Sequence, residues 1–259
     1  MDGIILAMAV IGGTGLGIGI LLGIAGRLLE IKVDEKEVAI RAELPGNNCG
    51  GCGYAGCDGL AKAISLGEAP VSACPVGGAA TAEAIGKIMG TSAEVVKMAA
   101  IIKCNGTCDK AQNKYNYIGN FSCKEAILMS GGAKKCTYGC LGLGTCASVC
   151  DYGAISVIDG VAVVDRDICV ACGKCVKACP KGLIEIIPHI NNEFVKCNTK
   201  VSGKEVRSVC TGGCIGCGKC SKECPAEAIT MVDKHPVIDY DKCVVCGVCK
   251  ESCPTKCIN

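Results

Sequence analysis

The chain has few of the side chains on which most substrate-binding and nucleic-acid-binding sites depend. Its 259 residues include no Trp, two Phe, six Tyr and two His. Because it has neither an aromatic platform nor a basic run, the sequence does not favour nucleic-acid binding. The run from Gly12 to Gly17 lies inside an apolar segment, so it does not form a nucleotide-binding loop. We therefore expect no NAD site, no flavin site and no catalytic residue on this chain.

Cysteine, by contrast, is abundant: there are 26 in the chain. Many of them fall in the pattern C-x2-C-x2-C-x3-C-P, in which three thiolates hold one [4Fe–4S] cluster and the fourth holds its neighbour. Three complete copies of the pattern begin at Cys169, Cys214 and Cys243. Disulfide scaffolds and zinc sites are weaker interpretations, because neither needs regular cysteine triplets. Thiols that bind iron also indicate a reducing compartment.

The second half of the chain is duplicated at a constant offset of 74 residues, so each copy is expected to be a two-cluster ferredoxin unit. Leu143 stands where the second copy has Cys217, and we expect Cys136 to supply the missing thiolate. A cluster with three cysteine ligands is the alternative. The predicted ligand sets are Cys136, Cys140, Cys146 and Cys179; Cys150, Cys169, Cys172 and Cys175; Cys214, Cys217, Cys220 and Cys253; and Cys224, Cys243, Cys246 and Cys249.

Short apolar runs in the first copy, Ile155 to Ile158 and Val161 to Val164, predict a β-hairpin around Asp159-Gly160. Thr91 to Ile102 is typical of a helix with an N-terminal cap.

A separate group of cysteines precedes the repeat. Cys49, Cys52, Cys57 and Cys74 have the spacing C-x2-C-x4-C-x16-C and glycines between them, so we expect them to hold one [4Fe–4S] cluster. Residues 58–66 have helical periodicity and would cover that cluster. With the repeat, this gives five expected clusters.

The remaining cysteines leave a sixth cluster open. Cys104, Cys108 and Cys123 could form it with Cys136, which would then be lost from the Leu143 site. Otherwise they are buried or free thiols. The roles of Cys197 and Cys210 stay open, Cys257 is expected to be a spare thiol, and the two histidines, His189 and His235, to be surface or packing residues.

The N-terminal segment from Gly3 to Gly26 carries no charged residue. At about 1.5 Å per residue it is long enough for a membrane-spanning helix, so we expect contact with the lipid bilayer through residues 3–26. Arg27 and Lys32 follow it, which favours a single-pass protein of the cell (inner) membrane with its C-terminal domains on the cytoplasmic side.

These signals divide the chain into five parts and predict an α+β protein. They are a transmembrane anchor (1–28), a helical four-cysteine [4Fe–4S] domain (29–95), a cysteine-containing insert (96–135), ferredoxin unit 1 (136–190) and ferredoxin unit 2 (191–259).

The order of these parts resembles the B subunit of the Rnf complex, the ion-translocating ferredoxin:NAD+ oxidoreductase. The resemblance covers essentially the whole chain and is most specific at Ala7 to Gly26 and Asn48 to Cys57. It implies a translocase subunit that takes electrons from soluble ferredoxin and feeds partner subunits that reduce NAD+ while Na+ or H+ crosses the membrane. The alternatives are an electron subunit of another membrane oxidoreductase and a non-redox structural iron–sulfur protein.

Overall fold

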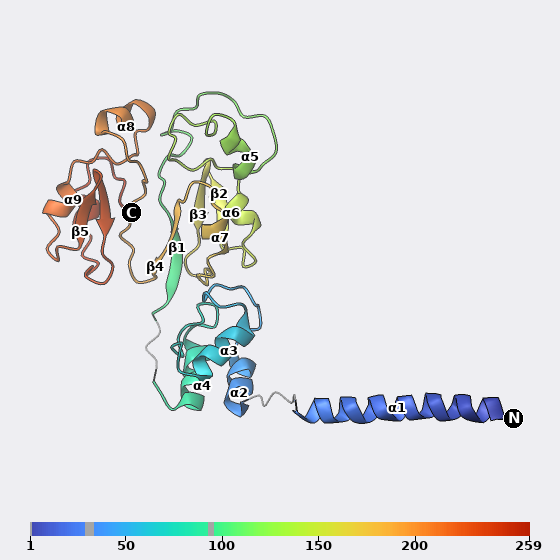
Figure 1. Ribbon diagram of the computed structural model, residues 1–259. Helices are drawn as coiled ribbons and strands as arrows, with labels where there is room; N and C mark the ends of the chain where they lie inside the picture. The colour runs from blue at the N-terminus through green and yellow to red at the C-terminus, as the bar shows by residue number, and fades with distance from the viewer. Residues whose placement is uncertain (1, 29–33, 93–95) are drawn as a thin grey trace.

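The computed structural model describes residues 2–28, 34–92 and 96–259. It combines short helices with two-stranded sheets (Figure 1). The helices are α1 (Asp2–Leu28), α2 (Glu35–Glu43), α3 (Cys57–Ser65), α4 (Gly78–Met89), α5 (Cys123–Leu128), α6 (Thr145–Ser148), α7 (Lys174–Ala178), α8 (Gly203–Val209), α9 (Lys219–Lys222) and α10 (Val248–Glu251). The strands are β1 (Met98–Ile102), β2 (Ile155–Ile158), β3 (Val161–Val164), β4 (Ile184–Pro188), β5 (Ile229–Val232) and β6 (His235–Ile238).

The N-terminal helix α1 lies apart from the other elements in Figure 1, and apolar side chains such as Ile11 and Leu16 are exposed on it. None of the helices in the described ranges qualifies as long and apolar enough to cross a membrane. The structure therefore does not support the single-pass anchor expected at residues 3–26.

Helices α2, α3 and α4 form one body around a small apolar core. Asp34 caps α2 by accepting a hydrogen bond from the Lys36 N–H at 3.0 Å, the usual role of aspartate at this position. Ile40, Leu60 and Ile85 are fully buried between the helices. Each such side chain contributes roughly 1.5–3 kcal/mol, so this body has a conventional core. The helix expected at residues 58–66 is confirmed as α3.

The helix expected from Thr91 to Ile102 is wrong over its second half. Met98–Ile102 is the strand β1, which pairs antiparallel with β4 so that Met98 faces Pro188 and Ile102 faces Ile184. A continuous buried apolar run suits a strand as well as a helix, and here the partner strand decides. Residues 93–95 lie outside the described part of the chain. The pairing ties the start of the insert to the end of unit 1.

Each ferredoxin unit contains one β-hairpin, β2–β3 in unit 1 and β5–β6 in unit 2. The hairpin expected around Asp159-Gly160 is confirmed. Its two central residues have positive φ, 48° and 74°, which is the backbone of the tight turn that suits the twist of paired strands.

The two units lie side by side in Figure 1, and the insert joins them. The backbone N–H of Gln112 donates to the Val209 carbonyl at 3.0 Å, and that of Thr211 donates to the Lys110 carbonyl at 3.0 Å. A segment that precedes unit 1 is therefore hydrogen-bonded to the end of α8 in unit 2.

Candidate iron–sulfur sites

The thiols of the α2–α4 body gather beside the N-terminus of α3. Burial raises the pKa of the Cys74 thiol, and the negative charge of Cys52 and Cys57 raises it further. The backbone N–H of Gly77 donates to the Cys74 sulfur at 3.3 Å. Asn48 shapes the loop by accepting a hydrogen bond from the Cys57 N–H at 2.8 Å. The loop therefore brings three of the four expected thiols together, while Cys49 lies on the side that faces unit 1.

Unit 2 gathers both of its expected sets of thiols. Two small cavities each have one set in their walls. One is lined by Cys214, Cys217, Cys220 and Cys253. The other is lined by Cys224, Cys243, Cys246 and Cys249.

Unit 1 also brings one expected set of thiols together. Burial raises the pKa of Cys175 to about 11, and the charges of Cys169, Cys172 and Cys150 add to the rise. The thiols are therefore within electrostatic reach of one another. This group corresponds to the Cys224, Cys243, Cys246 and Cys249 group in the repeat.

At the other unit 1 site, the structure places a thiol that the expected set does not contain. Burial raises the pKa of Cys146 to about 12, and the charges of Cys140, Cys123 and Cys179 raise it further. Cys123 is held there because its backbone N–H donates to Thr145 Oγ1, at the start of α6, at 2.8 Å. Cys123 is therefore a candidate for the fourth thiol at the Leu143 site.

Cys136, which the sequence predicts at that site, lies next to Cys104. A Cβ atom added at Gly139 would be 3.4 Å from the Cys136 sulfur and 3.7 Å from the Cys104 sulfur. The 74-residue offset pairs Cys123 with Cys197, but that spacing does not assign Cys123 to this site. The fold brings Cys123 and Cys146 together.

Backbone N–H groups point at several of these sulfurs. The N–H of Ala100 donates to Cys169 at 3.4 Å, that of Leu183 to Cys179 at 3.5 Å, and that of Ala228 to Cys224 at 3.4 Å. Such bonds stabilise thiolates and are one of the means by which proteins set cluster potentials. The donor set and its surroundings therefore fit [4Fe–4S] clusters.

Two further residues lie at the unit 2 site. Cys257, expected to be spare, is 2% exposed and its sulfur lies 3.6 Å from that of Cys253. Hydrogen bonds with Cys257 and, less strongly, with His235 lower the pKa of Cys214. Sequence reasoning missed this contact of His235, since no ligand-like spacing precedes it.

Within the described residues, no group of three or more His, Cys, Asp or Glu side chains is arranged to hold a single metal ion. Four thiolates on a single zinc ion must all lie roughly 2.3 Å from that ion. In a cubane each thiolate binds a different iron, so the four ligand sulfurs lie farther apart.

Three families match parts of the chain: an Fe-S cluster family over residues 44–76, a 4Fe-4S dicluster domain over 213–257 and a 4Fe-4S binding domain over 161–184. The B subunit of the Na(+)-translocating ferredoxin:NAD(+) oxidoreductase complex of Acetobacterium woodii is 46% identical, over 100% of this chain and 78% of its own length. The B subunit of the ion-translocating oxidoreductase complex of Methanosarcina acetivorans is 42% identical, over 91% and 90% respectively. Its counterpart in the proton-translocating ferredoxin:NAD(+) oxidoreductase complex of Clostridium ljungdahlii is 39% identical, over 92% and 85%. The chain belongs to the family of Rnf complex B subunits.

Within this family member, the α2–α4 body and unit 1 are in direct contact. The Asn47 side chain donates to the Tyr152 hydroxyl at 2.7 Å. A Cβ atom at Gly51 would lie 2.7 Å from the Cys172 carbonyl oxygen, so only glycine fits there. Burial is the main cause that raises the pKa of Tyr152, and the charges of Cys172 and Cys49 raise it further. One cysteine from each group therefore meets at this contact.

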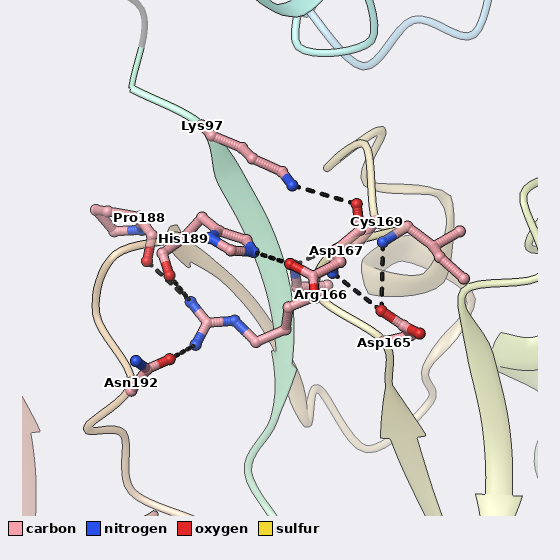
Figure 2. Close-up of polar contacts among 10 residues, drawn as sticks. Lys97, Asp165, Arg166, Asp167, Cys169, Pro188, His189 and Asn192 are labelled. Atoms are coloured by element: carbon pink, nitrogen blue, oxygen red, sulfur yellow. Dashed lines mark hydrogen bonds and ion pairs between the residues drawn. The ribbon is translucent and has the colours of Figure 1, made fainter.

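A polar network fixes the loop that leads into Cys169 (Figure 2). Arg166 donates to the carbonyls of Pro188 and His189, both at 3.0 Å. His189 Nε2 lies 3.0 Å from an Asp167 carboxylate oxygen, and Lys97 donates to the Asp167 carbonyl at 3.2 Å. His189 thus acts through packing and hydrogen bonding. The network holds this thiol loop against the segment that leads to unit 2.

Proposed function

We propose that this chain is the iron–sulfur electron-transfer subunit of a membrane complex that couples electron flow from reduced ferredoxin to NAD+ with translocation of Na+ or H+. The observation that supports it best is the series of five thiol groups carried by unit 2, unit 1 and the α2–α4 body. Bound at these sulfurs, [4Fe–4S] clusters would supply one-electron transfer. The chain's own residues position the clusters, exclude water and set their electrostatic surroundings.

Unit 2 exposes two of its thiols, Cys217 and Cys246, and we place the outer end of the series at Cys246. Cys246 is exposed, and the neighbouring Val244 side chain is 65% exposed. The equivalent of Cys246 in unit 1 is Cys172, which Gly51 covers. An electron can leave a soluble carrier only where a cluster edge is accessible. We therefore assign electron entry to the Cys246 edge and exit to the Cys49–Cys74 group.

Attachment to the membrane subunits belongs to the same proposal, and we assign it to α1. Its apolar side chains, such as Ile11 and Leu16, are exposed, and its glycines leave room for another helix to approach closely. Deletion of residues 2–28 should release the chain from the membrane fraction and leave its iron content unchanged. Retention in the membrane after this deletion would refute the role of α1.

The electron-transfer proposal is tested on the anaerobically purified full chain with reduced soluble ferredoxin as donor. Rapid mixing should bleach the visible absorption of the clusters, and EPR should show reduced [4Fe–4S] signals. Val244→Glu should slow this reduction several-fold, because it places a negative charge at the entry edge. Ile118→Glu, at an exposed site in the insert, is the control and should leave the rate unchanged. Iron that ferredoxin and dithionite both fail to reduce would overturn the function.

A further inference from the structure

Four cysteines outside the five groups above line one cavity of about 260 Å³ at the junction of the two ferredoxin units. They come from the insert, from the start of unit 1 and from unit 2. The four are Cys104, Cys136, Cys197 and Cys210. None of them belongs to a complete C-x2-C-x2-C-x3-C-P run.

The four thiols converge around Cys104. A Cβ atom at Gly106 would be 3.6 Å from the Cys104 sulfur and 3.7 Å from the Cys210 sulfur, so both thiols lie beside this glycine. A Cβ atom at Gly139 would be 3.4 Å from the Cys136 sulfur and 3.7 Å from the Cys104 sulfur, so these two thiols lie beside Gly139. Burial raises the pKa of Cys197 to about 11, and the charges of Cys214 and Cys104 add to it. Each of the other three thiols is therefore close to Cys104.

We propose that Cys104, Cys136, Cys197 and Cys210 hold a sixth [4Fe–4S] cluster, which links the two ferredoxin units. This ligand set differs from a sixth set made of Cys104, Cys108, Cys123 and Cys136. Cys123 lies near Cys146 at the Leu143 site, and Cys108 is exposed beside the turn of the β2–β3 hairpin. The proposal extends the electron-transfer function described above and rests on it.

Backbone donors at this cavity match those at the other groups. The Cys104 sulfur accepts hydrogen bonds from the N–H of Gly106 at 3.4 Å and from that of Cys140 at 3.3 Å. Backbone hydrogen bonds from Cys214 and Thr199 lower the pKa of Cys197 against the stronger effect of burial. A thiolate ligand needs such donors, whereas a structural thiol does not.

A buried cation stands beside the same thiols. Lys134 is 6% exposed, and its ammonium group donates to the Gly106 carbonyl at 2.6 Å and the Gly160 carbonyl at 2.8 Å. Its charge lowers the pKa of Cys210, although burial raises it more. A buried charge is costly unless an opposite charge compensates it. A four-thiolate cluster, with a formal charge of about −2 when oxidised, would supply that compensation.

The location gives the cluster a function. The Cys140 N–H that bonds the Cys104 sulfur belongs to a thiol residue of the Leu143 site, and the Cys214 backbone bonds Cys197 from the unit 2 side. The cavity is therefore in contact with one thiol group from each unit. A cluster here would relay single electrons from unit 2 to unit 1.

The test counts metal and sulfide on the anaerobically purified full chain. Six clusters predict about 24 irons and about 24 sulfides per chain, against about 20 for five. Cys197→Ser and Cys210→Ser should each lose about four irons and the same single EPR signal. The matched control Cys108→Ser should lose none. The five other signals, if retained in the variants, show that the fold survives.

A second variant gives a readout that does not depend on ligand loss. Lys134→Met should keep the full iron content and lower the midpoint potential of the sixth signal, because the added electron loses a nearby positive charge. About 20 irons in the wild type, all reducible, would overturn the sixth cluster and leave the proposed function standing. One zinc per chain, lost in Cys197→Ser, would also overturn it. Irreducible iron throughout would instead overturn the function itself.

Discussion

The two ferredoxin units descend from one repeat, yet they complete their clusters differently. Unit 2 has Cys217 in its first run and lines that cavity with its own thiols. Unit 1 has Leu143 at the equivalent position, and Cys123 of the insert lies near the remaining thiols of that site. We therefore expect unit 1 to depend on the insert at this site, whereas unit 2 supplies all four thiols itself.

The difference between Leu143 and Cys217 also explains why a second pair of equivalent residues, Cys123 and Cys197, has different surroundings. Cys123 and Cys197 are equivalent in the repeat. Because Cys217 already serves unit 2, Cys197 is free to line the cavity between the units. Leu143 leaves the corresponding site in unit 1 one thiol short, and we expect Cys123 to supply that thiol. A duplicated ligand position can thus be lost in one copy and gain a new role in the other.

The largest expected effect comes from Cys123→Ala. It should remove one cluster from unit 1, about four irons per chain, and leave both unit 2 clusters in place. Iron analysis and EPR check this, with Cys108→Ala as the control. Unchanged iron would show that three cysteines suffice at the Leu143 site.

The comparison predicts a rescue. Adding Leu143→Cys to the Cys123→Ala variant gives unit 1 the ligand arrangement of unit 2. About four irons should return. A double variant that stays short of iron would mean that the two first runs differ in backbone as well as in sequence.

A smaller effect is expected at Cys172 of unit 1, which Gly51 covers, whereas the equivalent Cys246 of unit 2 is exposed. Gly51→Val introduces a Cβ atom 2.7 Å from the Cys172 carbonyl, and overpacking of this kind costs about 1–3 kcal/mol. Electron transfer from unit 1 to the Cys49–Cys74 group should slow, measured by reduction kinetics of the separate EPR signals. Gly59→Ala, whose Cβ meets only an ordinary contact at 3.8 Å, should not change the rate.

The β2–β3 and β5–β6 turns can be compared by exchanging one residue between them. Gly160 and Lys234 occupy equivalent positions with φ of 74° and 64°. A Cβ atom at Gly160 would be 2.7 Å from the Cys108 sulfur. Gly160→Lys should therefore destabilise unit 1 by about 1–3 kcal/mol. Lys234→Gly should cost less than about 1 kcal/mol, and amide hydrogen exchange in the two hairpins would measure both.

The smallest effect belongs to Tyr152→Phe. It removes the hydroxyl that accepts the Asn47 hydrogen bond at 2.7 Å, an exposed contact worth about 0.5–1.5 kcal/mol. We expect a slightly lower melting temperature for the α2–α4 body and no loss of iron. Loss of the Cys49–Cys74 cluster in this variant would show that the contact determines cluster binding and not only docking.

Much of this arrangement follows from sequence because thiol spacing is local. The strict runs at Cys169, Cys214 and Cys243 predict their own grouping, and the hairpin around Asp159-Gly160 follows from short apolar runs and turn chemistry. The strand Met98–Ile102 resembles a helix in sequence because the partner strand that decides its structure begins only at Ile184. Cys123 and the cavity between the units escape prediction for the same reason: their neighbours come from separate parts of the chain.

The pairing of β1 with β4 has a consequence for biosynthesis. Ile102 meets Ile184 only after nearly the whole of unit 1 has been made, and such long-range closure is slow. Until then the unit 1 thiols, which become shielded in the folded chain, remain open to solvent and to oxidation. Exposure to oxygen should therefore damage the nascent chain far more readily than the assembled subunit.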